Sequence, residues 1–276
     1  MSTVIDEIRK GSAVEIDLLL SHILGKSREF LFMNPEYKLT SIQGHKLTSM
    51  IRRRQKGEPM AYILGYKDFY GLRFKVNKNV LIPRPETEEL IERLKDLKFK
   101  DYKQPIRVLD VGTGSGCIAV TLAKEFSIFN FQFSISASDI SAKALSVAKQ
   151  NAKAHKVKVK FLKSDLLKNI KFVPDIIIAN LPYGWSQWKN NTSAASVGLK
   201  FEPVRALFTK EKGLYEIHRL LKQIALLPSL PKCIYLEFDP RQKTELSKLI
   251  KKYLPSGDIK FHKDFNNLWR FAEITF

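Results

Sequence analysis

One four-residue turn in this chain has residue types and spacing that could bind and orient a planar nitrogen group. The apolar run 176–179 ends in Asn180, Leu181, Pro182 and Tyr183. Such a run is typical of a buried strand, and open α/β sheets place their chemistry beyond the carboxyl ends of strands. Asn offers one acceptor and two donors, Pro fixes the backbone, and Tyr offers a flat face. The turn suits an amide or a base amine, although an ordinary proline turn would read the same way.

A glycine-rich loop lies upstream, between a predicted strand over 106–111 and a predicted helix. Glycine permits positive φ and close approach of a ligand, and the start of the helix presents free N–H groups. The spacing is G-x-G-x-G, not the dinucleotide pattern G-x-G-x-x-G. A carboxylate at Asp110 would repel a pyrophosphate and suit an ammonium or sulfonium group. The residues predicted to bind this ligand are Asp110, Gly112, Thr113, Gly114, Ser115 and Gly116.

Two further carboxylates follow predicted strands. The segment 132–138 ends in Asp139, which is placed to accept hydrogen bonds from two ribose hydroxyls. After a predicted helix over 141–155, the alternating segment 157–162 leads to Asp165, which could contact an adenine amino group. A single Asp at a strand end is usually a turn or capping residue. Three acidic strand ends in order, followed by Asn-x-Pro-Tyr, are much harder to explain by capping.

This constellation resembles a class I S-adenosylmethionine-dependent methyltransferase, and the Asn-x-Pro-Tyr turn resembles that of enzymes methylating adenine N6, cytosine N4 or glutamine N5. The N-terminal third is similar to the release-factor glutamine methyltransferase family (PrmC/HemK). The most specific match is Leu-Ile-Pro-Arg-Pro-Glu-Thr-Glu at 81–88, where Thr87 and the acidic residues would also cap a helix. Further matching segments are 18–25, 52–65, 69–76, 202–207 and 263–271. The resemblance therefore covers almost the whole chain.

The resemblance implies an α/β fold, a Rossmann-like class I methyltransferase with a mostly parallel seven-stranded sheet, plus a small N-terminal helical domain. It implies S-adenosyl-L-methionine as cofactor and methyl transfer to N5 of the glutamine in the Gly-Gly-Gln motif of peptide chain release factors. The glycine loop and Asp110 would hold the cofactor together with Asp139, Asp165, Leu166 and Asn180. The implied catalytic residues are Asn180, Pro182 and Tyr183, and the implied substrate-binding residues are these three with Leu181, Arg84 and Glu86.

Three positions depart from the family's pattern. Leu181 replaces the first proline of Asn-Pro-Pro-Tyr, which keeps the backbone carbonyl but loosens the φ restraint, so a less preorganised turn is expected. Leu166 stands where an aromatic residue is common, so weaker adenine stacking is expected. Residues 236–240 differ from the usual Glu-Ile-Gly, although Gln242 is retained.

Alternative functions stay open at this point. Asn-Leu-Pro-Tyr is also the form of some rRNA adenine methyltransferases, so an RNA or DNA adenine-N6 methyltransferase is one alternative; it predicts a flipped base stacked on Tyr183 and steep salt dependence of binding. A ribosomal-protein glutamine methyltransferase shares the same turn. A non-catalytic binding protein that has kept the fold is a third, and it would bind cofactor without transferring methyl.

The pattern divides the 276 residues into three segments. Residues 1–72 are predicted to form an N-terminal helical substrate-recognition domain, 73–85 a β-hairpin or linker, and 86–276 the methyltransferase domain, where helices and strands alternate as in a parallel sheet. Within it, residues 193–211 have little periodicity and are predicted to form a loop on the substrate side.

Composition limits the setting in which the protein works. No apolar stretch reaches about 18 residues, so no membrane span is expected. The only cysteines are Cys117 and Cys233, both in apolar contexts, which suits a reducing cytoplasm. No His/Cys cluster has metal-ligand spacing, so no metal is expected. The net charge of +19 comes mostly from scattered Lys residues; it predicts non-specific RNA contact without making RNA the substrate, and a monomer is expected.

Overall fold

The computed structural model describes residues 3–4, 13–97, 105–128, 132–185 and 196–276. The chain folds into two compact units, Met1–Gly65 and Tyr66–Phe276. Among the described residues, none of the helices has the length and apolarity needed to cross a membrane.

The first unit is helical. Its helices are α2 (Ala13–Leu24), α3 (Arg28–Met33), α4 (Ser41–Gln55) and α5 (Met60–Leu64). Helix α4 begins at a capping box, in which the Thr40 hydroxyl accepts from Gln43 N and the Gln43 side chain accepts from Thr40 N. Leu19, Leu20 and Leu47 lie in the buried centre of this unit. The apolar faces of short helices therefore supply a small core of their own.

A two-stranded hairpin opens the second unit. Strands β1 (Tyr66–Phe69) and β2 (Leu72–Lys75) pair antiparallel, joined by Tyr70 and Gly71 at φ of 50° and 68°. Two positive φ values match the twist of a tight hairpin. Of the two alternatives predicted for 73–85, a β-hairpin or a linker, the hairpin lies earlier in the chain, at 66–75. Asn77 begins a turn closed by Val80 N donating to Asn77 O at 3.1 Å, and residues 76–85 contain no strand, as the linker alternative expects. The helical unit accordingly ends at Gly65 rather than at the predicted residue 72.

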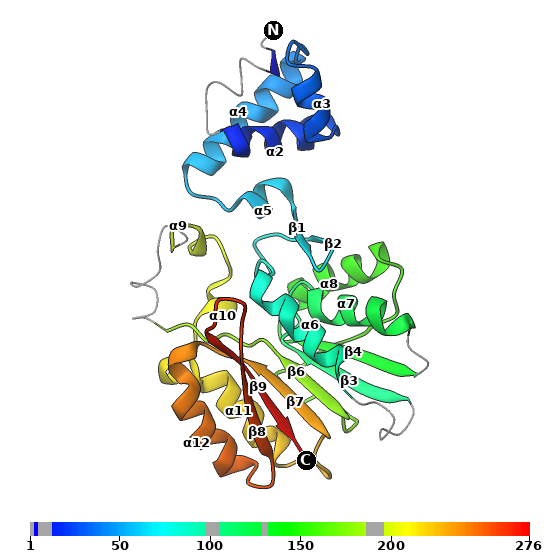
Figure 1. Ribbon diagram of the computed structural model, residues 1–276, viewed down its shortest axis with the longest axis vertical. Coiled ribbons are helices and arrows are strands. Elements are labelled where there is room, and N and C mark those ends of the chain that lie inside the picture. The colour runs from blue at the N-terminus through cyan, green and yellow to red at the C-terminus, as the bar shows by residue number, and fades with distance from the viewer. Residues whose placement is uncertain (1–2, 5–12, 98–104, 129–131, 186–195) are drawn as a thin grey trace. The chain divides into compact units, whose positions relative to one another are not determined.

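The second unit is built on a seven-stranded sheet in the order β5-β4-β3-β6-β7-β9-β8 (Figure 1). Its strands are β3 (Ile106–Val111), β4 (Phe133–Asp139), β5 (Lys160–Lys163), β6 (Ile176–Ala179), β7 (Cys233–Glu237), β8 (Asp258–Lys263) and β9 (Trp269–Thr275). The first five are parallel, and β9 runs antiparallel to both β7 and β8. A mostly parallel sheet in one unit and a small helical unit in the other confirm the predicted fold class.

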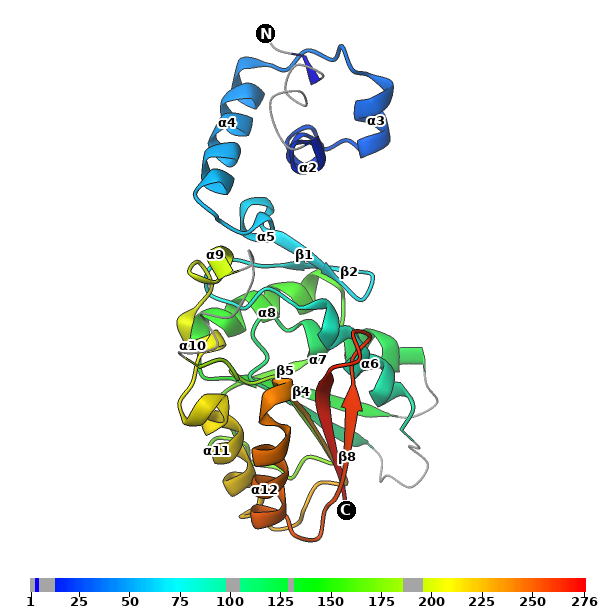
Figure 2. The same cartoon turned by 60° about the vertical axis from the view of Figure 1, so that its left-hand side comes forward.

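Helices cover both faces of the sheet (Figures 1 and 2). Helices α6 (Glu88–Lys95), α7 (Cys117–Glu125) and α8 (Ala142–Ala154) share one core with Val108 and Ile178, whereas α11 (Tyr215–Ile224) and α12 (Lys243–Tyr253) share the other with Leu109 and Ile177. Neighbouring residues of one strand thus serve opposite cores, as the period of two requires. The shorter elements are η1 (Pro85–Thr87), η3 (Phe126–Ile128), α9 (Ser196–Leu199), α10 (Val204–Leu207), η5 (Glu211–Gly213) and η6 (Pro240–Gln242).

Sheet register brings the predicted strand ends together. Strand β3 lies between β4 and β6, and Val111 pairs with Ser138 on one side and Ala179 on the other. The residues that follow these three positions therefore leave the same edge of the sheet. The chain turns to opposite sides of β3 here, and such a switch point forms a crevice.

Candidate active site

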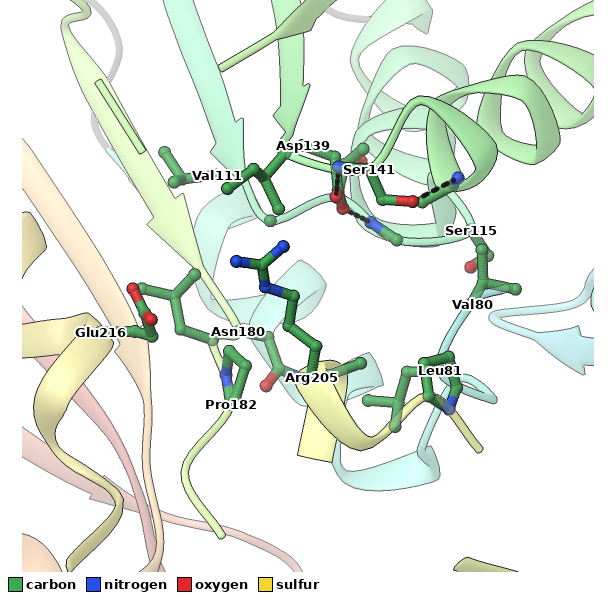
Figure 3. Close-up of a pocket in the computed structure, with 18 of the residues that line it drawn as sticks. Val80, Leu81, Val111, Ser115, Asp139, Ser141, Asn180, Pro182, Arg205 and Glu216 are labelled. Carbon is green, nitrogen blue, oxygen red and sulfur yellow. Dashed lines mark hydrogen bonds between the residues drawn. The ribbon is translucent and has the colours of Figure 1, made fainter. Parts of the chain in front are cut away.

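A cavity of about 360 Å³ opens at the carboxyl ends of β3, β4, β5 and β6 (Figure 3). Apolar and polar side chains from several chain segments line it. They include Val80, Leu81, Arg84, Thr87, Gly112, Thr113, Gly114, Ser115, Asp139, Ile140, Asp165, Leu166, Asn180, Leu181, Pro182, Arg205, Glu216 and Arg219. Most predicted site residues are therefore in one place, while Asp110, Gly116, Tyr183 and Glu86 lie outside the lining.

The glycine loop is fixed from below. Gly112 N and Thr113 N donate to Ser138 O at 2.8 and 2.9 Å, and Asp110 Oδ2 accepts from Thr113 Oγ1 at 2.6 Å. Asp110 is only 1% exposed, and burial raises its pKa to about 7, against the lowering effect of the Thr113 hydrogen bond. Asp110 therefore stabilises the loop through Thr113. Asp110 does not line the cavity, so the structure does not support its predicted contact with a cationic ligand.

Asp139 is held by backbone N–H groups. Its Oδ2 accepts from Gly114 N at 3.0 Å and its Oδ1 from Ser141 N at 2.8 Å. Burial raises the pKa of Asp139, while these hydrogen bonds and the charge of Arg205 lower it. Each carboxylate oxygen has a second lone pair, so a carboxylate in this position can still accept from two hydroxyl groups.

Asp165 carries two ion pairs at the same edge. Its Oδ2 lies 2.6 Å from Arg219 Nη2 and 3.0 Å from Lys168 Nζ, and the Arg219 hydrogen bond is the main cause that lowers the pKa of Asp165. The next residue, Leu166, lines the cavity with φ of 52°. A left-handed conformation costs a non-glycine residue roughly 1–2 kcal/mol, so the surrounding fold imposes this placement.

The amide of Asn180 is part of a buried hydrogen-bonded chain. Asn180 Nδ2 donates to Thr87 Oγ1 at 3.2 Å, and Thr87 Oγ1 donates to Glu237 Oε2 at 2.8 Å. Thr87 and Glu237 are 2% and 1% exposed. Burial raises the pKa of Glu237 to about 7, while Thr87, Arg270 and Tyr183 lower it. The sequence predicts Thr87 as a helix cap; its side chain makes no capping hydrogen bond, because its hydroxyl is committed to Glu237.

Tyr183 is not among the residues that line the cavity. Its hydroxyl donates to Glu237 Oε1 at 3.3 Å, and its carbonyl accepts from Gln242 Nε2 at 2.9 Å. Burial, and then the charge of Glu237, raise the pKa of the phenol. The structure thus gives Tyr183 an anchoring position behind the turn, whereas the sequence predicts a flat face toward the substrate.

Arg84 lines the cavity and forms an ion pair that holds the segment before α6 in place. Arg84 Nη2 lies 2.6 Å from Glu202 Oε1, and Glu202 Oε2 accepts from Ile82 N at 3.0 Å. Glu202 is buried, whereas the Arg84 side chain is 30% exposed, so only the acidic partner of this ion pair is buried. It ties the segment before α6 to the segment that carries α10.

Sequence reasoning missed Thr87, Glu237, Arg205 and Arg219 as site residues. Figure 3 shows the Arg205 side chain projecting into the cavity from α10. Arg205 falls in the predicted loop 193–211, of which 193–195 lie outside the described residues and the remainder holds α9, α10 and the first residue of η5. A single Arg in a segment without hydrophobic periodicity has no sequence feature from which its place in a cavity could be predicted. Among the described residues, no group of three or more His, Cys, Asp or Glu could hold a metal ion.

Comparison with known proteins gives two family matches and many relatives. Residues 9–65 match the PrmC N-terminal domain, and residues 86–197 match the methyltransferase small domain. The release factor glutamine methyltransferase of Koribacter versatilis is 42% identical over 75% of this chain and 72% of its own length. That of Bacillus cereus is 34% identical over 94% of this chain and 91% of its own length.

Solved structures share the fold at low identity. The hMettl16 catalytic domain, in complex with an MAT2A 3'UTR hairpin, aligns with a TM-score of 0.59 at 14% identity, covering 86% of this chain and 82% of its own. A methyltransferase from Pyrococcus furiosus aligns with a TM-score of 0.50 at 18% identity, covering 83% of this chain and 96% of its own.

Proposed function

This chain belongs to the release factor glutamine methyltransferase family, as its sequence predicts, and we propose that it methylates the N5 side-chain amide of the glutamine in the Gly-Gly-Gln motif of a peptide chain release factor. S-adenosyl-L-methionine is the proposed methyl donor. The observation that carries the proposal is Asn180, which lines the cavity with its amino group bonded to Thr87.

The residues of the cavity fit this cofactor. A volume of about 360 Å³ is within the usual range for small-molecule sites. Asp139 has lone pairs for two ribose hydroxyls, Ile140 and Leu166 offer apolar surface for an adenine ring, and Asp165 offers an acceptor for its amino group. Arg205 offers a charge partner for a carboxylate. These four features match the chemically different parts of one ligand.

Asn180 would orient the substrate amide. Because its Nδ2 donates to Thr87, its Oδ1 is the end that can accept an N–H from the substrate. A backbone carbonyl of the same turn is proposed as the second acceptor. When bound, S-adenosyl-L-methionine supplies a methyl group on a positively charged sulfur, and the glutamine nitrogen that receives this methyl then releases one proton. Alignment can lower a barrier by up to roughly 7–11 kcal/mol in ideal cases, so a strong base is not required before transfer.

Label transfer tests the proposal. Methyl-labelled S-adenosyl-L-methionine would be supplied with a bacterial release factor carrying Gly-Gly-Gln, its Gln→Ala variant, ribosomal proteins and total RNA. Label on the wild-type factor and none on the Gln→Ala factor is the expected result. Label on RNA alone would identify a base methyltransferase, label on a ribosomal protein alone would change the protein substrate, and cofactor binding with no transfer would identify a binding protein.

The proposal places the enzyme in the cytoplasm as a monomer. Cys117 and Cys233 are buried free thiols, which suits a reducing compartment. The net charge of +19 supports weak contact with RNA that salt disrupts. Sedimentation of the protein with and without RNA, at low and high salt, tests the monomer and the RNA contact, and a salt-resistant RNA complex or a dimer would contradict them.

A further inference from the structure

We infer that Glu237 and Thr87 act as positioning residues that hold the Asn180 side-chain amide in the one orientation that accepts an N–H from the substrate. The inference rests on the proposed function and deepens it. It assigns a task to two buried residues that stand 150 positions apart in the chain and are joined by a hydrogen bond, with Thr87 lining the cavity.

Three separate elements deliver the three side chains. Thr87 ends η1, Glu237 ends β7, and Asn180 follows β6. Strands β6 and β7 are parallel neighbours, with Ala179 paired to Leu236, so Asn180 and Glu237 are at equivalent positions one step further on. Thr87 bridges them, at 3.2 Å from Asn180 Nδ2 and 2.8 Å from Glu237 Oε2.

The carboxylate sets the direction of both hydrogen bonds. An ionised carboxylate can only accept, so the single hydroxyl hydrogen of Thr87 must point to Glu237. Thr87 Oγ1 then has only lone pairs to offer Asn180, and only the Nδ2 end of the amide can bond to it. Asn180 Oδ1 is therefore directed away from Thr87 and is the end available to a substrate N–H.

Without this constraint the amide has two nearly isosteric orientations. The amino and carbonyl ends of Asn are alike in size and differ in hydrogen-bonding sense. If the Thr87 hydroxyl donated to Asn180 Oδ1, Nδ2 would be the end available to the substrate. Two N–H groups would then face each other, and the substrate amide would lose its acceptor. The orientation of one hydroxyl thus decides whether Asn180 can accept a hydrogen bond from the substrate amide and align it.

Ion pairing does not account for Glu237, and helix capping does not account for Thr87. A buried carboxylate is unfavourable unless it is paired, and the ion pair found for the nearby Arg270 is with Asp264 at 3.0 Å. Glu237 is instead bonded by two hydroxyls, of Thr87 and Tyr183. Thr87 in turn stands at the start of α6 but makes no capping hydrogen bond. The Thr87 hydroxyl therefore serves the chain of hydrogen bonds that ends at Asn180 and not the helix.

We call the hydrogen-bonded series Glu237, Thr87 and Asn180 the relay. Steady-state kinetics on the full-length enzyme tests it. Thr87→Val keeps the shape and removes the hydroxyl, Thr87→Ser keeps the hydroxyl, and Glu237→Gln allows the hydroxyl to turn. The matched control is Thr121→Val, the same change at a fully buried Thr in α7. We expect Thr87→Val to lower kcat about 100-fold, as a misaligned reactant would, while Thr87→Ser restores it and Thr121→Val leaves it unchanged.

The inference has readouts other than turnover. Cofactor affinity by calorimetry should change little in Thr87→Val and Glu237→Gln, because the relay orients the substrate acceptor. The thermal midpoint should fall in Thr87→Val, which removes one of the two hydroxyls bonded to the buried Glu237 carboxylate, and Thr87→Ser should restore it. Turnover in Thr87→Val equal to that in Thr121→Val would overturn the inference. Parallel loss of cofactor binding, stability and turnover in both relay variants, without rescue by Thr87→Ser, would also overturn it, because it would indicate a merely structural role.

Failure of the relay can be told apart from failure of the proposed function. Transfer by the wild-type enzyme is measured first, on the release factor and on RNA. If only RNA is labelled, the proposed function fails, and the kcat comparison on RNA still tests whether Thr87 orients Asn180. If the factor is labelled and Thr87→Val is fully active, the function stands and the relay fails.

Discussion

The side chain of Leu181 packs directly over the backbone of Gly112, where an added Cβ would come within 2.9 Å of Leu181 Cδ2. Leu181 is 4% exposed and belongs to the core that contains Ala179 and Leu214. The residue that replaces a proline in the Asn-x-Pro-Tyr turn therefore contacts the glycine loop. Burial of this side chain offsets the lost φ restraint, which by itself would loosen the turn.

This contact predicts energetic coupling between the two loops. Gly112→Ala would clash with Leu181 and strain a residue at φ of 78°, so cofactor affinity should fall. Leu181→Ala removes the clashing group, so the double variant should recover part of the loss. The expected coupling free energy is about 0.5–3 kcal/mol, measured as cofactor Kd by calorimetry in the two single variants and the double variant.

Gly114 provides the control for this cycle. It also has positive φ, at 56°, but an added Cβ there meets only Gly112 O at 4.0 Å. Gly114→Ala and Leu181→Ala should therefore act additively on cofactor Kd. Additive effects in the Gly112 cycle, or equal coupling in both cycles, would contradict a specific contact between Gly112 and Leu181.

Asn180 should affect turnover far more than cofactor binding. Asn180→Ala removes the acceptor for the substrate N–H but leaves Asp139 and the glycine loop in place, so kcat should fall by about 100-fold with a change in cofactor Kd of only a few fold. Single-turnover methyl transfer and calorimetry give the two values. Equal losses in both would show that Asn180 serves the cofactor.

Gly213 and Gly44 should respond to alanine with opposite signs. Gly213 has φ of 85°, and its Cβ would overlap the carbonyl group of Tyr183 and the Gln242 side chain, which holds that carbonyl. Gly44 lies within α4, with nothing within 4 Å of an added Cβ. Gly44→Ala should stabilise the fold by roughly 0.5–1 kcal/mol.

Gly213→Ala should destabilise the protein by about 1–3 kcal/mol, and it should lower kcat because the turn behind Asn180 must shift. Urea denaturation and turnover measure the two effects. A Gly213→Ala enzyme with wild-type stability and kcat would show that Gln242 and Gly213 do not hold the Tyr183 carbonyl in place.

The strand ends of this site could be predicted from the sequence, whereas its supporting contacts could not. Gly112, Asp139, Asp165 and Asn180 follow apolar runs, and parallel strands present their carboxyl ends at one edge. The bond between Thr87 and Glu237 depends on which strands are neighbours and on the path of η1. Local pattern assigns Thr87 to capping, because a Thr before a helix is usually a cap.

Local signals are also insufficient at two other places. The hairpin turn contains Tyr70, a residue that rarely adopts positive φ, so the Asn-rich segment 77–79 is the stronger turn signal. Tyr183 carries the right residue type for stacking, yet its hydroxyl is bonded to Glu237. A buried carboxylate 54 residues away determines the direction of that ring, and no periodicity reveals it.

Glu237 predicts a pH dependence of stability with a definite sign. Burial raises the folded-state pKa of Glu237 from the ordinary 4.5 to about 7. The folded protein therefore retains this proton over a range in which the unfolded chain has lost it, so the free energy of unfolding falls as pH rises from about 4.5 to 7. The groups that bear on it are Thr87 and Tyr183 through hydrogen bonds, Arg270 by opposite charge, and Glu86 and Cys117.

Titration of Glu237 should also change turnover, which should rise with pH over the range in which stability falls. Below pH 7 a protonated Glu237 can donate to Thr87 Oγ1, which frees the Thr87 hydroxyl to turn toward Asn180 Oδ1. Turnover should therefore rise with pH through about 7, while stability declines by at most about 3 kcal/mol. The Glu237→Gln variant has no carboxyl group to titrate at this position. Its pH profiles of turnover and of stability should therefore both lack the change that Glu237 contributes. Burial also raises the pKa of Asp110 to about 7. The free energy of unfolding of the Glu237→Gln variant should therefore still fall as pH rises, by a smaller amount. Wild-type and Glu237→Gln enzymes with the same pH dependence of kcat would show that the carboxylate does not set the orientation of Asn180.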